Sequence, residues 1–315
     1  MANLNTNLPI FLVGSVRSGT TLLRLMLDHH PDIGFNLESE YLVTQIADDG
    51  TFPSVQSYKE FLLADRVFQH SEFEIKDHSS FVEIVHDFLE QKKARDGKSF
   101  VGATVHNDFG KLKLIWPNAK YIYIYRDGRD VANSIVQMGW AGNSYVAADN
   151  WLEIEKEWEF LRKTLPDTAW LEVKYEELTS DPKKQLTKIC EFIGTSFNDK
   201  MFDYIHHSRY KFPDSAFNYQ WKKNSPRSIQ LMENKLADRL ITRGYEISGL
   251  PKLDLSELEK RFLYLYSRVK CFHFRLKNYG AVLVLLETFT RRLSLEKINQ
   301  KLNKRIDQVI DFNLK

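Results

Sequence analysis

Short apolar runs alternate with helical patterns along the first 249 residues. Continuous runs rich in β-branched and aromatic residues occur at 9–13, 121–125 and 169–173. Runs of this length suit strands that are buried on both faces of a parallel sheet. Helical patterns occupy segments near 20–30, 79–94, 128–138, 148–164, 181–193 and 226–243. The alternation predicts a doubly wound, mostly parallel α/β sheet flanked by helices.

The last part of the chain has a different pattern. Gly249-Leu250-Pro251 predicts a domain boundary, with one domain at 1–249 and a helical C-terminal extension at 250–315. In this extension apolar residues recur every three or four positions, which predicts an amphipathic helix. These residues are Leu255, Leu258, Phe262, Leu265, Val269 and Phe272.

Charge is divided unevenly between the two parts. The extension has 14 Lys and Arg against 7 Asp and Glu, or +7, and the first 249 residues have 30 against 35, or −5. A basic amphipathic extension can rest on an anionic membrane. The alternative is a helical hairpin packed on its own domain or on a second copy of the chain, and both remain open here.

Composition narrows the class of protein. The chain has 315 residues, 43% hydrophobic and 27% charged, which is typical of a globular protein and excludes collagen-like, disordered and multi-span membrane classes. Its net charge of +2 gives no indication of a nucleic-acid partner. Cys190 and Cys271 form no CxxC pair, which favours a reducing compartment. The start of the chain lacks a basic signal-peptide region, and the apolar run 8–13 is too short for a membrane span, so we expect a cytoplasmic protein.

The first expected strand leads into a loop with the spacing of a phosphate-binding loop. The segment reads Gly14-Ser15-Val16-Arg17-Ser18-Gly19-Thr20-Thr21 and precedes an apolar helical segment. Glycines let backbone N–H groups converge, and the helix N-terminus adds partial positive charge. Thr20 stands where nucleotide hydrolases carry a lysine, so Arg17 must supply the positive charge. The alternative is an ordinary glycine-containing turn.

A second polar segment follows the expected strand 121–125. Arg126 stands at the carboxyl end of this strand, where open α/β sheets bind ligands. Ser134 lies eight residues further on, along the next helical segment, and a guanidinium with a hydroxyl suits a phosphomonoester. The alternative is a solvated ion-pair turn in which Arg126 and Arg129 pair with Asp127 and Asp130.

Taken together, these ordered motifs resemble the P-loop sulfotransferase family. The resemblance covers residues 8–247 and includes Arg17-Ser18-Gly19-Thr20-Thr21-Leu22, Tyr125-Arg126-Asp127-Gly128-Arg129-Asp130-Val131-Ala132-Asn133-Ser134, Val173-Lys174-Tyr175-Glu176-Glu177-Leu178 and Trp221-Lys222-Lys223-Asn224. It implies that the first loop binds the 5′-phosphosulfate of 3′-phosphoadenosine 5′-phosphosulfate (PAPS), and that the second motif binds the 3′-phosphate. The donor-binding residues implied are Arg17, Ser18, Gly19, Thr20, Thr21, Arg126, Ser134, Tyr175 beside the adenine, and Lys222 and Lys223 closing the pocket. For Tyr175 the alternative is a core residue, and for the lysine pair it is a solvated pair beside a core Trp221.

The resemblance implies transfer of a sulfuryl group from PAPS to an acceptor hydroxyl or amine. Such a reaction needs in-line positioning, a base for the acceptor proton and cations near the departing oxygens. Arg17 would neutralise charge near the transferred group. No metal is expected, because the adjacent histidines at 29–30 and 206–207 face different ways and have no partner set. We expect a small-molecule, carbohydrate or lipid acceptor.

The identity of the base is open at the level of sequence. Glu38 resembles in placement the catalytic Glu of the tyrosylprotein branch, and Glu40 is close enough to be the true occupant. His106 resembles the catalytic His of the small-molecule branch. The alternative for Glu38 is a surface carboxylate, and the alternative for His106 is a hydrogen-bonded loop histidine. Many relatives have a lysine in this segment that aids the leaving phosphate, whereas this chain reads Ala103-Thr104-Val105-His106-Asn107; Lys111 and Lys113 lie nearby.

Two other function classes are compatible with the loop motif. One is a P-loop nucleotide kinase or hydrolase, against which the missing loop lysine counts. The other is a non-catalytic phosphonucleotide-binding protein, in which the fold persists without a base. Turnover of a triphosphate with Mg²⁺ would favour the first, and donor binding without transfer would favour the second.

Overall fold

The computed structural model describes residues 8–293 and, after them, residues 295, 298, 299, 301–303, 305, 306 and 309. Contacts group the chain into two compact units. The first contains Met1–Val131 and Trp151–Gln220, and the second contains Ala132–Asn150 and Trp221–Lys315. The domain boundary expected after residue 249 stays a prediction.

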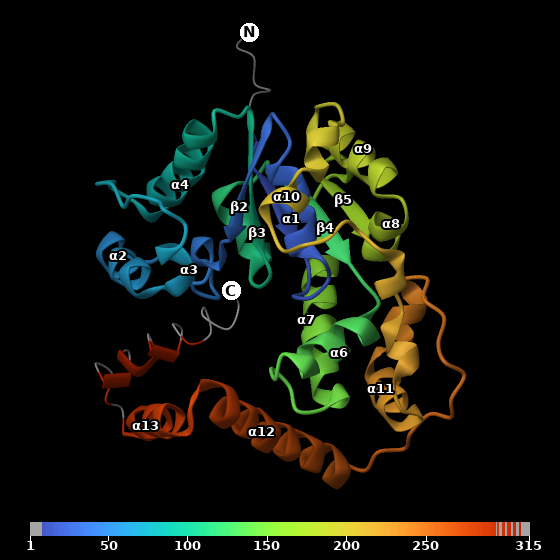
Figure 1. Ribbon diagram of the computed structural model, residues 1–315. Helices are drawn as coiled ribbons and strands as arrows, with labels where there is room; N and C mark the ends of the chain where they lie inside the picture. The colour runs from blue at the N-terminus through green and yellow to red at the C-terminus, as the bar shows by residue number, and fades with distance from the viewer. Residues whose placement is uncertain are drawn as a thin grey trace. The chain divides into compact units, whose positions relative to one another are not determined.

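A five-stranded parallel sheet forms the centre of the first unit (Figure 1). Its order is β2-β3-β1-β4-β5, so the first strand lies in the middle. This confirms the doubly wound α/β fold, and the three expected strands correspond to β1, β4 and β5. The strands are β1 Ile10–Val13, β2 Ile33–Glu38, β3 Phe100–Val105, β4 Lys120–Tyr125 and β5 Trp170–Lys174.

The expected helices are present, with ends set by local signals. For example, Asp181 accepts a hydrogen bond from the backbone N–H of Lys184, and Pro182 occupies the first turn. The α-helices are α1 Thr20–Asp28, α2 Val55–Ala64, α3 Arg66–Gln69, α4 Phe81–Asp96, α5 Leu112–Ile115, α6 Gly128–Gln137, α7 Ser144–Arg162, α8 Tyr175–Ser180, α9 Pro182–Ile193, α10 Tyr204–His207, α11 Pro226–Thr242, α12 Glu257–Tyr279 and α13 Ala281–Arg292.

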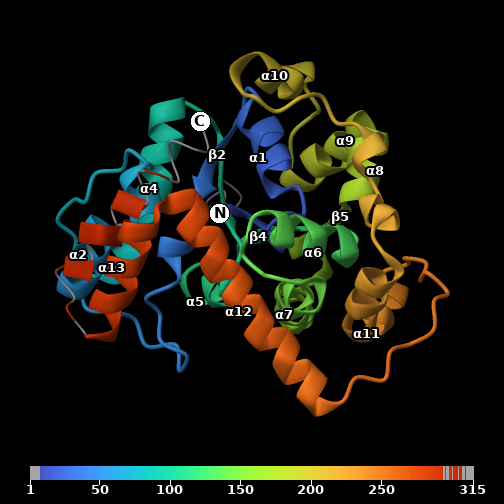
Figure 2. The same ribbon diagram turned by 60° about the horizontal axis from the view of Figure 1, so that its bottom comes forward.

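Both faces of the sheet are covered by hydrophobic side chains. On one face, alternate residues of β1, β3 and β4 pack with α4 and the second half of α7, where Trp158 stacks on Tyr123 at a centroid distance of 4.5 Å. On the other face, the remaining residues of β1 and β4 pack with α1 and α9. Figures 1 and 2 both show α8 and α9 side by side next to β5. Burial on both faces explains why the strand sequences are continuously apolar.

Two strands, β2 and β3, were not expected from the pattern. β3 contains Gly102, which weakens strand propensity. A Cβ on Gly102 would lie 2.2 Å from Phe35 of β2 and 2.6 Å from the carbonyl oxygen of Ile10, so close packing between neighbouring strands requires glycine there. The pairing of β2 with β3 also shifts register between Phe35 and Glu38. Tertiary packing, rather than local pattern, therefore specifies these two strands.

The chain leaves β1 and β4 toward opposite faces of the sheet. The helix after β1 packs on one face, and the α7 segment before β5 packs on the other. Such a switch point opens a crevice at the carboxyl ends of the two strands, where α/β proteins bind ligands. The loop beginning at Gly14 and the segment beginning at Arg126 both start at this edge.

Candidate active site

The loop between β1 and α1 is shaped to bind an anion. Arg17 and Gly19 have positive φ angles of 69° and 95°, which curl the backbone. α1 then begins at Thr20 with neither a side-chain cap nor an acidic residue in its first turn. The first N–H groups of a helix have no partners within the helix and carry partial positive charge. This N-terminus therefore suits a phosphate or sulfate group.

The loop packs against β4 and against Tyr175, the first residue of α8. A Cβ on Gly14 would lie 2.3 Å from the carbonyl oxygen of Ile124, and a Cβ on Gly19 would lie 2.3 Å from Cδ2 of Tyr175. Glycine is thus required at both ends of the loop, by contact as well as by conformation.

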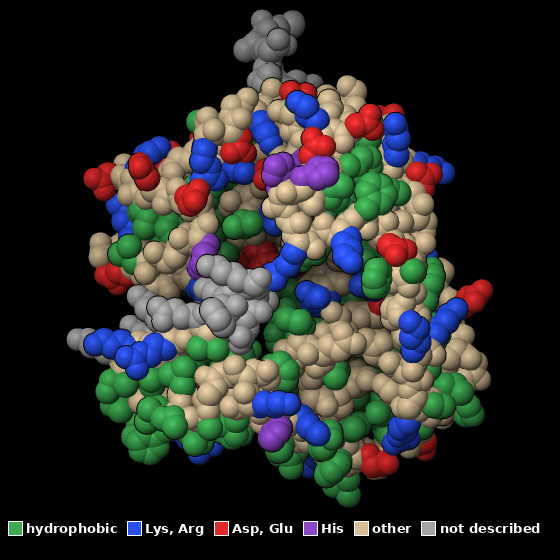
Figure 3. Space-filling model, in the orientation of Figure 1, with side chains coloured by type: hydrophobic (Ala, Val, Ile, Leu, Met, Phe, Trp, Pro, Cys, Tyr) green, Lys and Arg blue, Asp and Glu red, His purple; other side chains and the backbone are tan. Residues whose placement is uncertain are grey.

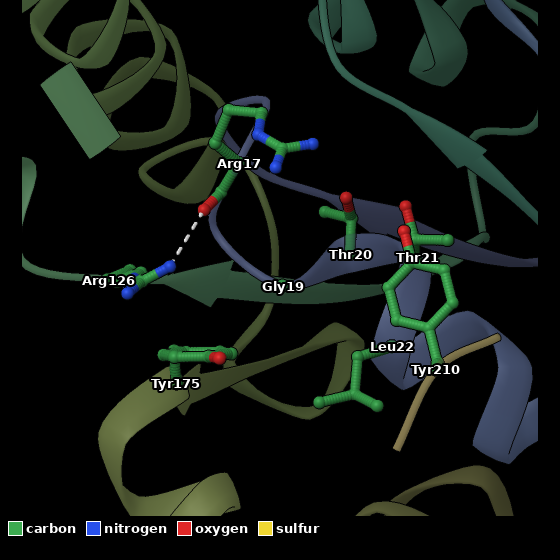
Figure 4. A pocket seen from close by; sticks show the side chains of 8 residues that line it. All are labelled: Arg17, Gly19, Thr20, Thr21, Leu22, Arg126, Tyr175 and Tyr210. Carbon is green, nitrogen blue, oxygen red and sulfur yellow. Dashed lines mark hydrogen bonds between the residues drawn. The ribbon is translucent and has the colours of Figure 1, made fainter. Parts of the chain in front are cut away.

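Arg126 links three segments around the loop. Its Nη1 donates to the carbonyl oxygen of Arg17 at 3.5 Å, and its Nη2 donates to the carbonyl oxygen of Phe217 at 3.0 Å. Its guanidinium carbon lies 4.4 Å from the centroid of the Tyr175 ring, a cation–π distance. These contacts hold the guanidinium beside the loop, as Figure 4 shows.

A cavity of about 150 Å³ opens at this place. Its described lining contains two arginines and no acidic residue, so it favours an anion (Figure 4). The lining residues are Arg17, Gly19, Thr20, Thr21, Leu22, Arg126, Tyr175 and Tyr210.

Six of the expected donor-binding residues therefore line one pocket. Ser18 does not; its side chain is fully buried, and its Oγ has no hydrogen-bond partner among the described residues. Tyr210 was not expected, because its segment has neither a motif nor a periodic pattern. Ser134 on α6, with Lys222 and Lys223 on a short 3₁₀ turn, belongs to the second unit, and the role of these three residues stays a prediction.

The turn after β4 contains the expected ion pairs, but they are buried rather than solvated. Nε and Nη2 of Arg129 donate to the two carboxylate oxygens of Asp127 at 3.0 and 2.8 Å, and both side chains are almost fully buried. Arg126 lies 3.4 Å from Asp130. A bidentate buried pair fixes the turn geometrically. Arg129 thus has a structural contact, while Arg126 faces the cavity.

The three candidate bases form one cluster at the carboxyl ends of β2 and β3. His106 is buried, and its Nδ1 lies 2.9 Å from the carbonyl oxygen of Gly14. Its Nε2 lies 3.8 Å from Oε1 of Glu38, an ion-pair distance that is too long for a hydrogen bond. Its backbone N–H donates to Oε1 of Glu40 at 3.0 Å. One histidine therefore connects the anion loop with both carboxylates.

The surroundings of His106 favour its charged form. A carbonyl oxygen only accepts hydrogen bonds, so Nδ1 carries a proton, and a second proton on Nε2 gives the ring a positive charge that faces the Glu38 carboxylate. Burial lowers the pKa of His106, but the contact with Glu38, the charge of Glu40 and the Gly14 carbonyl outweigh it, so the pKa lies above its ordinary value.

The two carboxylates differ in environment. The contact with His106, together with the charge of Arg24, outweighs burial and lowers the pKa of Glu38. Burial raises the pKa of Glu40. The Glu38 side chain is 55% exposed, whereas one oxygen of Glu40 is occupied by the His106 backbone. Glu38 is therefore the carboxylate of this cluster that is more open to solvent.

Arg24 on α1 is a neighbour of this cluster that sequence reasoning missed. It is partly buried and interacts electrostatically with Glu38, while burial lowers its pKa. It is the only charged residue in the apolar run Leu22–Leu27, and this isolated charge was the available signal. Among the described residues, no group of three or more His, Cys, Asp and Glu is arranged to hold a metal ion.

Comparison with known proteins places this geometry in a family context. A model described as "Sulfotransferase family" matches residues 9–199. Protein-tyrosine sulfotransferase A of Caenorhabditis elegans is 28% identical over 210 residues, covering 64% of this chain and 52% of the relative. Protein-tyrosine sulfotransferase of Drosophila melanogaster is 28% identical over 223 residues, covering 65% and 41%. The chain thus spans about half the length of these curated relatives, or less.

Solved structures show the same fold. The sulfotransferase domain of the Synechococcus PCC 7002 olefin synthase aligns with a TM-score of 0.54 and 21% identity, covering 76% of this chain and 94% of that domain. The sulfotransferase domain from the curacin biosynthetic pathway aligns with a TM-score of 0.55 and 17% identity, covering 77% and 100%.

Proposed function

Because the chain belongs to the sulfotransferase family, we propose that it transfers the sulfuryl group of PAPS to an acceptor hydroxyl or amine. The observation that carries this proposal is the convergence of Arg17 and Arg126 on one anion pocket at the uncapped start of α1. In this reaction the bond between sulfur and the phosphate oxygen breaks, and a bond between the acceptor atom and sulfur forms. The acceptor proton passes to a base, and 3′-phosphoadenosine 5′-phosphate leaves.

The residues around the pocket suit the two ends of the donor. The N–H groups at the start of α1 and the Arg17 guanidinium would hold the 5′-phosphosulfate and stabilise charge that develops on the departing oxygens. Arg126 would hold the 3′-phosphate, with Ser134 as its partner. Tyr175, whose ring lies under the Arg126 guanidinium, would pack beside the adenine. Lys222 and Lys223 complete the proposed donor site.

Glu38 is the proposed base. It is exposed enough to meet an acceptor, and its lowered pKa keeps it ionised at neutral pH. His106 then acts as a positioning residue, since its imidazole holds Glu38 relative to the Gly14 carbonyl. Glu40 supports His106 through the backbone N–H and is not proposed to react.

The relatives indicate which class of acceptor to test first. The relatives named above are protein-tyrosine sulfotransferases, so a phenolic hydroxyl is the first acceptor to test. Small-molecule, carbohydrate and lipid alcohols are the further classes.

The test is transfer of radiolabelled sulfate from PAPS by the purified full chain to a panel of tyrosine peptides, phenols, sugars and lipid alcohols. We expect transfer to at least one class, and transfer that is roughly ten- to a hundredfold slower by an Arg126→Ala variant when PAPS is below its dissociation constant. Arg162→Ala is the matched control, because Arg162 contacts Glu172 and Trp170 of β5. Trp170 is the first residue of β5 and lies at the amino end of the strand, whereas the anion loop and Arg126 lie at the carboxyl ends of β1 and β4. Binding of PAPS without transfer or hydrolysis would show a non-catalytic binder. Mg²⁺-dependent triphosphate turnover in place of PAPS chemistry would contradict the proposal.

A further inference from the structure

The most apolar face of α12 is exposed. Leu258, Phe262, Leu265 and Val269 recur at helical spacing on one side of the helix, with exposed fractions of 77%, 65%, 60% and 60%. Helices of globular proteins usually bury such a stripe. Four large side chains in a row on the surface therefore indicate something that covers them.

The opposite face of α12 is the one that packs within the second unit. Ser267 is buried, and its Oγ accepts a hydrogen bond from the backbone N–H of Gly142 at 2.8 Å. A Cβ on Gly142 would lie 2.7 Å from Cα of Ser267, so the two backbones are in close contact. The carbonyl oxygen of Leu263 accepts from Asn143 at 2.7 Å. These contacts fix α12 in an orientation that leaves Leu258, Phe262, Leu265 and Val269 exposed.

α13 extends the exposed apolar surface. Val282, Leu285 and Phe289 are 73%, 53% and 60% exposed. An ion pair of 3.1 Å between Arg275 and Glu287 joins α13 to α12. Figure 3 shows hydrophobic side chains gathered over α13 and the adjoining part of α12, with Lys and Arg beside them. We call the exposed apolar residues of these two helices the apolar stripe.

Basic residues border the stripe on α12. By helical position, Arg261 and Arg268 lie on one side of it, and Lys270 and Lys277 lie on the other; all four are exposed. The acidic residues of α12 lie only in its first turn, where Glu259 forms a capping box with Ser256. The centre of the stripe is therefore apolar with positive margins.

We propose that α12 and α13 dock on the surface of an anionic membrane, with the apolar stripe in the interface and the basic margins on the lipid headgroups. Helices that lie in a membrane interface typically have an exposed apolar face that is flanked by basic residues. Among the described residues, no helix is long and apolar enough to cross a membrane, so the contact is peripheral. A second copy of the chain fits less well, because a symmetric contact brings the same basic margins together, like charge against like charge. This inference is independent of the proposed reaction.

Co-sedimentation with vesicles tests the docking. The full chain is mixed, without PAPS, with vesicles of phosphatidylcholine alone and of equal parts phosphatidylcholine and phosphatidylglycerol. We expect pelleting with the anionic vesicles that weakens as salt is raised. Phe262→Ser/Leu265→Ser should weaken partitioning by about tenfold or more, because two apolar side chains are removed from the interface. Leu63→Ser/Phe160→Ser removes two side chains of similar exposure from α2 and α7 and should leave vesicle binding unchanged.

Reversing the charge of the basic margin gives a second test of vesicle binding that does not depend on the apolar variant. Arg261→Glu/Arg268→Glu should reduce binding to anionic vesicles by about tenfold or more, whereas Lys184→Glu/Lys188→Glu on the exposed face of α9 should not. Absence of vesicle binding by the unaltered chain would overturn the proposal. It would equally be overturned if Phe262→Ser/Leu265→Ser left vesicle binding intact but converted a dimer into a monomer in analytical ultracentrifugation.

Discussion

His106 donates through Nδ1 to the carbonyl oxygen of Gly14 at 2.9 Å, which ties the end of β3 to the first residue of the anion loop. The other ring nitrogen faces Glu38. The distance between the proposed base and the donor pocket is therefore set through one side chain. This arrangement places the three candidate bases in different environments, since Glu38 is exposed, His106 is buried and one oxygen of Glu40 accepts from the His106 backbone N–H.

Replacing Glu38 should slow the reaction without weakening donor binding. Glu38→Gln keeps the size of the side chain but removes the base, so kcat should fall by roughly 10²- to 10⁴-fold. Affinity for 3′-phosphoadenosine 5′-phosphate, measured by calorimetry, should change little, because Glu38 does not line the anion cavity.

Glu40→Gln is the matched control for this prediction. A glutamine can still accept from the His106 N–H, so single-turnover rates should stay within a few-fold of the unaltered enzyme. Equal losses in both variants would contradict the assignment of the base to Glu38.

His106→Asn should shift the acidic limb of the rate profile upward in pH. The asparagine amide can still donate to the Gly14 carbonyl, but the contact that lowers the pKa of Glu38 is lost. The pKa of Glu38 then rises toward the ordinary 4.5, so the variant loses activity at a higher pH as acid is added. A profile of kcat against pH that falls in parallel at all pH values would show a merely structural role for His106.

The same histidine should make stability depend on pH. Its pKa in the folded state lies above the ordinary 6.5, so the proton contributes stability that is complete below pH 6.5 and is lost as pH rises through the raised pKa. The difference in free energy of unfolding between the unaltered chain and His106→Asn should therefore shrink as pH increases from 6.5. Urea unfolding at a series of pH values measures it. A difference that is constant over this range would show that His106 is neutral in the folded protein.

The sequence predicted those parts of the molecule that local pattern specifies. The phosphate-loop spacing placed Gly14 and Gly19 correctly, and the position of Arg126 after a strand placed it at the same edge of the sheet. The resemblance to sulfotransferases is confirmed by the family match. β2 and β3 escaped prediction because contacts such as that of Gly102 with Phe35 are made between segments far apart in sequence. For the same reason the sequence could not show that Glu38 and His106 meet.

Arg126→Ala should weaken binding of 3′-phosphoadenosine 5′-phosphate by roughly ten- to a hundredfold. A hydrogen bond to a charged group contributes about 1.5–3 kcal/mol, and Arg126 is one of two arginines that line the cavity. Calorimetry measures the loss, and thermal unfolding shows whether the fold survives. Arg162→Ala should bind normally. Normal affinity in Arg126→Ala would remove this residue from the donor site.

Gly19→Ala should damage the donor site more than backbone conformation alone explains. Gly19 and Gly194 both have positive φ angles, of 95° and 107°, so alanine at either position costs about 1–2 kcal/mol in conformation. At Gly194 nothing lies within 4 Å of the new Cβ, whereas at Gly19 the Cβ would lie 2.3 Å from Tyr175 and must displace its ring. Because the Arg126 guanidinium lies over the Tyr175 ring, displacement of the ring should also weaken nucleotide binding. We therefore expect Gly194→Ala to lose stability only, and Gly19→Ala to lose stability and affinity together, in unfolding and calorimetric measurements. Equal nucleotide affinity in the two variants would show that the contact between the loop and Tyr175 does not shape the site.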